Sequence, residues 1–101
     1  MSGIRYHRLL ERDLAQAITF YERRVEGLGK AFFDEFNDAV LRAASSPLAG
    51  SPMRGTVRRQ LLHRFPYSVV YNIEEDGILV LTVMHQRRHP NTWQRRLRSG
   101  Q

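Results

Sequence analysis

Residues 57–96 decide the fold, and they read VRRQLLHRFPYSVVYNIEEDGILVLTVMHQRRHPNTWQRR. Three runs within them have the apolar patterns of β-strands, namely 57–65, 68–74 and 78–84. Pro66 separates the first two runs because proline lacks the N–H that a strand ladder needs. Glu75-Asp76-Gly77 predicts a hairpin turn between the last two. The same residues include ten arginines and histidines, so the pattern predicts a sheet edged by cations and suited to an anionic partner.

The residues before this stretch change to a helical period. Ile4 and Tyr6 alternate with polar residues and predict a short first strand, and His7 follows directly. Apolar residues then recur every three or four positions over 9–25 and again over 30–45, which predicts two amphipathic helices. Because only residues 26–29 connect them, the two helices must lie antiparallel as a helical hairpin.

The remaining segments are a loop and a short terminal helix. Residues 46–56 are rich in serine, proline and glycine and predict a loop, and Pro90 can begin a last helix that runs to Leu97. The predicted order is therefore β-α-α-β-β-β with a C-terminal helical turn, in one domain over residues 1–101. This is an α+β fold, with a small, antiparallel-rich sheet covered on one face by the helical hairpin.

This fold assigns the residues to a core and a second face. The second helix is expected to bury an apolar set that consists of Phe32, Phe33, Phe36, Val40, Ala43 and Ala44. The face opposite the hairpin is expected to carry Arg58, Arg64 and the groups after the last strand.

Composition narrows the class of protein. The net charge is +6, and the whole excess lies in residues 54–101, which hold nine arginines and three acidic residues. No cysteine is present, and His85 and His89 are not expected to share a helix face, so we expect no metal site and no cofactor. No apolar run is long enough to cross a membrane, and a soluble cytoplasmic protein is the expectation.

The chain resembles the RelE/ParE superfamily of toxins from type II toxin–antitoxin systems. The residues that carry the resemblance are YERRVEGLGKAFFDEF over 21–36, RFPYSVVY over 64–71 and the pattern H-x-R-R-x-P-x-x-W over 85–93. The resemblance covers nearly the whole chain and is strongest to the ParE-type branch. It implies a toxin neutralised by an antitoxin with an acidic, partly disordered C-terminal segment.

The resemblance leaves three functions open. ParE-like members are associated with inhibition of DNA gyrase, which is a protein target, whereas RelE-like members cut mRNA on the ribosome. A third alternative is a non-toxic module that only binds its antitoxin. The resemblance places Ser68 and Gln86 where the nuclease branch has arginines. That branch also has a tyrosine or a histidine–tyrosine pair near the C-terminus, and the nearest aromatic residue here is Trp93. An indole cannot act as acid or base, so the sequence favours binding over RNA cleavage.

His85 keeps the nuclease alternative open. A histidine at the end of a central strand can serve as a general base, with Arg59, Arg64 and Arg87 to stabilise a phosphorane. The competing interpretation is a histidine that hydrogen-bonds locally and packs on Trp93. For binding a partner, the candidate residues are Arg58, Arg59, Arg64, Arg87, Arg88 and Trp93.

Overall fold

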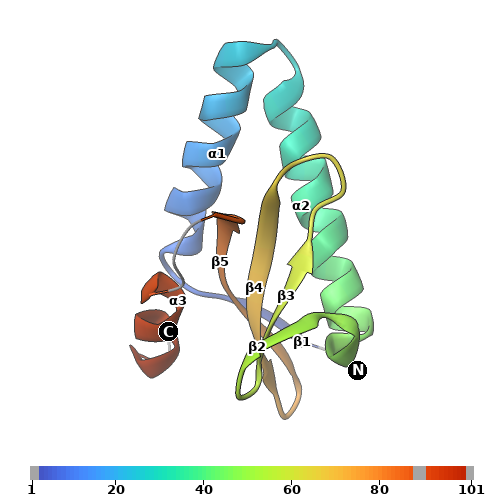
Figure 1. Ribbon diagram of the computed structural model, residues 1–101, viewed down its shortest axis with the longest axis vertical. Coiled ribbons are helices and arrows are strands. Elements are labelled where there is room, and N and C mark those ends of the chain that lie inside the picture. The colour runs from blue at the N-terminus through green and yellow to red at the C-terminus, as the bar shows by residue number, and fades with distance from the viewer. Residues whose placement is uncertain (1–2, 88–90, 100–101) are drawn as a thin grey trace.

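The computed structural model describes residues 3–87 and 91–99. Its elements are β1 (Gly3–Tyr6), α1 (Leu10–Arg24), α2 (Leu28–Ser45), the 3-10 turn η1 (Pro47–Ala49), β2 (Ser51–Arg54), β3 (Val57–Leu61), β4 (Tyr67–Glu74), β5 (Gly77–His85) and α3 (Asn91–Ser99) (Figure 1). The predicted α+β fold is confirmed, with a helical hairpin packed on a five-stranded sheet.

The strand order is β1-β5-β4-β3-β2, with β1 parallel to β5 and every other pair antiparallel. Two predictions about the β3–β2 edge of the sheet need correction. The segment predicted as a loop over 46–56 contains the edge strand β2, and the strand predicted over 57–65 ends at Leu61. Residues 62–66 turn the chain back because Leu62 N donates to Tyr67 O, which closes the loop around Pro66.

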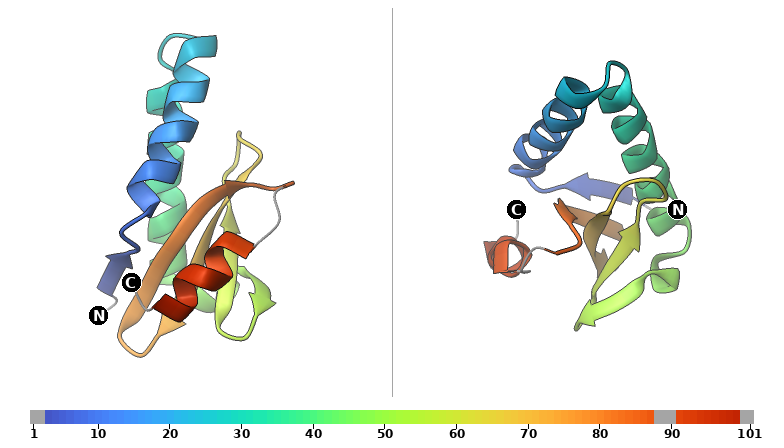
Figure 2. Two further views of the ribbon diagram at one scale, coloured as in Figure 1. Left: turned by 90° about the vertical axis from the view of Figure 1, so that its left-hand side faces the viewer. Right: turned by 45° about the horizontal axis from the view of Figure 1, so that its top comes forward.

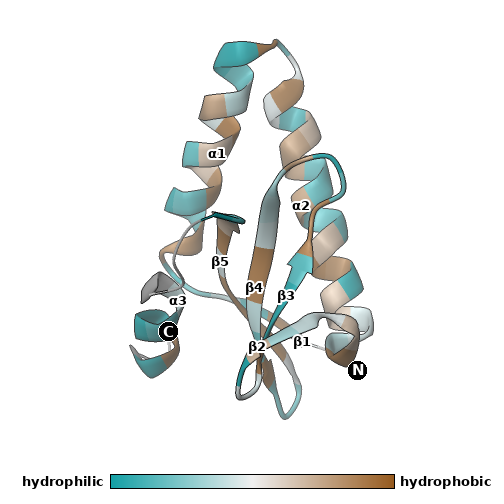
Figure 3. Cartoon of the chain, in the orientation of Figure 1, coloured by the Kyte–Doolittle hydropathy of each residue, from teal (hydrophilic) through white to brown (hydrophobic). Residues whose placement is uncertain are grey.

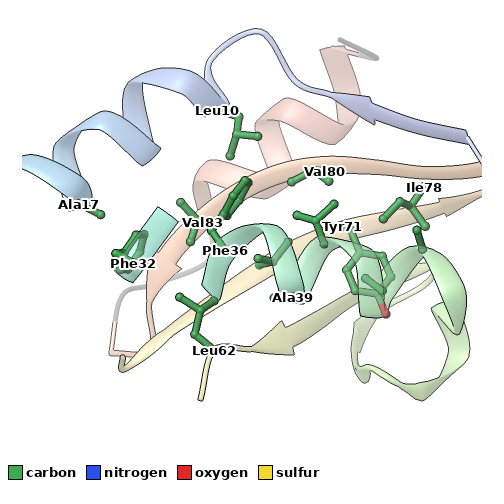
Figure 4. Close-up of a cluster of buried hydrophobic side chains, with 14 of the residues drawn as sticks. Leu10, Ala17, Phe32, Phe36, Ala39, Leu62, Tyr71, Ile78, Val80 and Val83 are labelled. Atoms are coloured by element: carbon green, nitrogen blue, oxygen red, sulfur yellow. The ribbon is translucent and has the colours of Figure 1, made fainter. Parts of the chain in front are cut away.

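The main core lies between the hairpin and the sheet (Figure 4). Phe32 and Phe36 of α2 meet Val80 and Val83 of β5 there, and all four are buried. The prediction for Phe33 was wrong, because its side chain is 42% exposed. One residue is a 100° rotation on a helix, so Phe33 lies at the flank of the apolar stripe that Phe32 and Phe36 centre on.

The hairpin turn is held by one carboxylate. Glu22 accepts hydrogen bonds from Gly27 N (3.0 Å) and Gly29 N (2.9 Å), and these two bonds lower its pKa. A Cβ at Gly29 would lie 2.9 Å from Ile18 O, so the absence of a side chain there lets α2 approach α1. The GLG sequence therefore fixes both the turn and the helix contact.

The second face of the sheet has its own apolar cluster, formed by Val57, Val70, Leu79, Leu81 and Trp93. Helix α3 lies over this face (Figure 2), and its own Trp93 packs against the sheet and is 3% exposed. Hydropathy colouring shows the apolar run of β5 beside the mostly polar α3 (Figure 3). The expectation that Arg58 and Arg64 occupy this face was wrong, because both are held by groups elsewhere, as described below.

A buried ion pair ties α3 to the rest of the fold. The Arg96 guanidinium, 4% exposed, donates to Asp13 Oδ2 and Oδ1 of α1 and to Leu81 O (2.8 Å) of β5. The Thr82 hydroxyl donates to the same Asp13 carboxylate at 2.7 Å. The position of α3 thus depends on a polar contact as well as on Trp93.

Candidate partner-binding site

The sheet has an incomplete edge on the side of α1. Strand β5 has nine residues, but β1 pairs only with Gly77 to Val80, and His7 N donates to Val80 O where β1 ends. In the described part of the chain, no strand lies beside residues 81–85 on this side. A strand edge of this kind presents backbone N–H and C=O groups to a further chain.

A hollow of about 500 Å³ lies against this edge. Its walls are the inner side of α1 and the end of β5, and it is lined by Asp13, Gln16, Ala17, Phe20, Tyr67, Thr82, Val83, Met84, His85 and Arg87. Phe20 is 46% exposed at the rim, although it is a large apolar side chain. The hollow therefore combines apolar wall, backbone edge and the two basic side chains His85 and Arg87.

His85 is positioned by Tyr67 and Arg87. Its ring packs edge-on against Tyr67, with the centroids 5.4 Å apart, and its Nδ1 accepts a hydrogen bond from Arg87 N at 3.1 Å. A neutral imidazole that accepts at Nδ1 carries its proton on Nε2, so the remaining nitrogen is a donor. In this arrangement the Nδ1 lone pair of His85 is used in a local bond to the backbone.

The structure does not assemble the four residues of the nuclease hypothesis. His85 and Arg87 line the hollow, whereas Arg59 and Arg64 do not. His85 pairs with Tyr67, which packs toward the hairpin, whereas Arg59 shares the opposite face with Val57 because side chains alternate along β3.

Arg64 and Arg58 each bond to the protein's own groups. Arg64 Nε donates to Glu35 Oε2 (2.7 Å), while the backbone N–H groups of His63 and Arg64 donate to Glu35 Oε1 (2.9 Å each). Burial acts to raise the pKa of Glu35, but these bonds and the charge of Arg64 outweigh it, and the pKa is lowered. Arg58 donates to Leu48 O (3.0 Å) and Gly50 O (2.7 Å), which fixes η1 against the sheet.

The other predicted positions are distributed as follows. Arg88 and His89 lie outside the described residues, and the Trp93 side chain of α3 is buried against the sheet. Ser68 is buried on the face of the second apolar cluster, and its Oγ forms no hydrogen bond within the described part of the chain. Gln86 is exposed, and its backbone N–H donates to Pro66 O. A role of Trp93 in binding a partner stays a prediction.

Sequence reasoning missed the contribution of α1 to the site. Asp13, Gln16 and Phe20 line the hollow, yet all three are off the main apolar stripe of the helix. The one available signal was Phe20, an aromatic residue placed outside that stripe. Among residues 3–87 and 91–99, no group of acidic and histidine side chains is arranged to hold a metal ion. No helix in these ranges is long and apolar enough to cross a membrane.

The comparisons with known proteins agree with this architecture. A solved structure described as the chromosomal ParDE TA system from P. aeruginosa contains a chain that superposes with a TM-score of 0.73, at 17% sequence identity. The match covers 84% of this chain and 96% of that chain, which shows a shared fold. No curated protein matches the sequence. The model of the ParE toxin of the type II toxin-antitoxin system parDE matches residues 4–90, and the chain therefore belongs to the ParE toxin family.

Proposed function

We propose that this protein is the toxin of a type II toxin–antitoxin pair that acts by binding a protein target, such as DNA gyrase, and that an acidic antitoxin neutralises it. The observation that carries the proposal is the site itself. It offers a strand edge and a hollow with an apolar wall for a polypeptide. Of the basic residues in the nuclease hypothesis, Arg59 lies on the face of the sheet opposite His85, and Arg64 does not line the hollow.

The antitoxin is proposed to use the edge of β5. A partner segment laid along residues 82–85 would add a strand to the sheet, and strand addition of this kind gives affinity through main-chain hydrogen bonds. Its side chains would enter the hollow beside Ala17 and Phe20. The positive charge of Arg87 would favour acidic residues in that segment.

The first experiment decides between the binding function and the nuclease alternative. The purified toxin is tested for inhibition of gyrase supercoiling and, in parallel, for mRNA cleavage on ribosomes. We expect inhibition of supercoiling and intact mRNA. Cleavage of mRNA with undisturbed supercoiling would overturn the proposal.

Two histidine variants sharpen the test. We expect His85→Ala to arrest growth as the parent does, because its Nδ1 is used in a local bond to Arg87 N. His63→Ala is the matched control, since this histidine is exposed and only its backbone N–H bonds to Glu35. Loss of toxicity in His85→Ala alone, together with loss of cleavage, would establish the nuclease. Overexpression of the parent without growth arrest would favour a non-toxic module that only binds its antitoxin.

A further inference from the structure

The outer face of α1 carries a second hollow that the strand-edge site does not explain. It has a volume of about 550 Å³ and is lined by Arg12, Ala15, Gln16, Thr19, Phe20, Arg23 and Arg24. Gln16 and Phe20 line both hollows, so the two are continuous around the exposed ring of Phe20. A chain leaving the β5 edge would therefore meet this surface next.

The surface is apolar at its centre and positive at its rim. The Arg24 guanidinium packs on one face of the Phe20 ring, 4.3 Å from the ring centroid. No acidic residue lines this hollow. In the described part of the chain, no ion pair is formed by Arg12 or Arg23, and both are exposed.

None of the three acidic residues of α1, which are Glu11, Asp13 and Glu22, lines this hollow, and two of them are bonded elsewhere. Asp13 is bonded to Arg96 and Thr82, on the side of β5 and α3. Glu22 is bonded to the backbone of Gly27 and Gly29 at the hairpin turn. The hollow on the outer face of α1 thus has three arginines and no acidic residue around an exposed aromatic ring.

These features select a polypeptide over a nucleic acid. Single-stranded nucleic acids are bound by successive aromatic rings on which bases stack, and this hollow has the single ring of Phe20. Continuity with a strand edge also favours a partner with backbone N–H and C=O groups. A partner segment with an apolar side chain between carboxylates would match the apolar centre and the arginine rim of this hollow.

We propose that this outer face of α1, built by Arg12, Phe20, Arg23 and Arg24, is the second half of the antitoxin site. It binds an acidic stretch of the antitoxin, with an apolar side chain packed on Phe20 and carboxylates paired to Arg12 and Arg23. The inference rests on the proposed function and specifies the chemistry of its partner.

The test measures binding of the full-length antitoxin encoded beside the toxin gene, by calorimetry at two salt concentrations. The variant Arg12→Glu/Arg23→Glu reverses the rim, and Arg24 is left unchanged because it packs on Phe20. The matched control, Arg95→Glu/Arg98→Glu, reverses two exposed arginines of α3 with the same change in net charge. We expect about a 100-fold loss of affinity for the α1 variant, with weaker salt dependence, and less than about a threefold loss for the control.

Phe20→Ala separates the apolar centre from the rim. We expect it to weaken binding by about tenfold or more with unchanged salt dependence, since it removes packing and no charge. Circular dichroism melts establish that each variant folds; all substituted side chains are exposed by a third or more. If a variant does not fold, Arg23→Glu alone replaces the α1 double variant.

The outcomes separate this inference from the proposed function. If neither the parent nor the control binds the antitoxin, the proposed function fails. If the parent binds and the α1 variant binds within threefold of the control, only the inference fails. A single-stranded RNA probe is measured in parallel, and an α1 variant that loses RNA binding but keeps antitoxin binding would also overturn it.

Discussion

Replacement of Arg96 by methionine tests the contact that fixes α3. The guanidinium is 4% exposed and donates to both carboxylate oxygens of Asp13 and to Leu81 O. In Arg96→Met, Asp13 keeps the hydrogen bond from the hydroxyl of Thr82, and its carboxylate stays mostly buried. Removing one partner of a buried pair costs about 3–5 kcal/mol, because the other charge is left uncompensated.

We expect Arg96→Met to lower the free energy of unfolding by about 3 kcal/mol, at the low end of that range because Thr82 still contacts Asp13. In a domain of this size, each kcal/mol lowers the melting temperature by about 4–8 °C, so the melting temperature should fall by about 12–24 °C. Urea denaturation followed by circular dichroism measures the change. Hydrogen exchange of the α3 amides shows whether the helix opens alone or together with the sheet.

The control is Arg95→Met, which removes an exposed guanidinium from the same helix. Exposed substitutions of this kind usually change stability by less than about 0.5 kcal/mol. A loss below about 1 kcal/mol in Arg96→Met, with α3 still protected from exchange, would refute the reasoning. The same result would mean that Trp93 and Leu97 hold α3 without the ion pair.

Three further substitutions test other contacts. Because its pKa is lowered, ionised Glu35 stabilises the parent above pH 4.5, and this stability is lost as the pH falls through the lowered pKa. Glu35→Gln should remove this pH-dependent stability. Parallel acid denaturation curves for parent and variant would contradict the prediction. His7 has a pKa lowered by burial and then by Arg96 and Arg8, so the parent should lose stability as the pH falls below 6.5. His7→Asn keeps an acceptor for Leu9 N and should reduce that loss, as measured by urea titrations at pH 7.5 and 5.5; an unchanged pH dependence would exclude His7 as its source. Gly29→Ala should lower the free energy of unfolding by about 1–3 kcal/mol, because the alanine Cβ would lie 2.9 Å from Ile18 O. An unchanged melting temperature would show that α1 and α2 move apart without cost.

Local patterns were sufficient to predict most of the architecture. The helical periods over 9–25 and 30–45, the short connection between them and the Asp-Gly turn each specify structure within a few neighbouring residues. The strand β2 was missed because Ser-Pro-Met-Arg has weak strand propensity. Its extended conformation is stabilised by backbone pairing with β3, which local sequence patterns do not reveal. Pro52 is compatible with this position because β2 is an edge strand.

The site was harder to predict because it depends on contacts between distant residues. The arginine pattern indicated a cationic surface, but Arg58 bonds to carbonyl groups at and beside η1, and Arg64 bonds to the Glu35 carboxylate of α2. These partners lie 8 to 29 residues away in the chain, and neither spacing nor composition identifies them. The hollow arises because β1 stops at Tyr6 while β5 continues to His85, a mismatch between strands that lie some seventy residues apart in sequence. Phe20 gains its place at the rim only through that mismatch.

The incomplete pairing of β5 has a consequence for the toxin when it is alone. Two copies could align residues 82–85 antiparallel across a twofold axis, so the edge that suits a partner strand also suits self-association. An antitoxin that covered this edge would then act as a solubility factor as well as an inhibitor. The yield of soluble toxin after removal of the antitoxin would in that case fall with protein concentration. The difference in length between β1 and β5 would thereby favour self-association of the toxin once the antitoxin is removed.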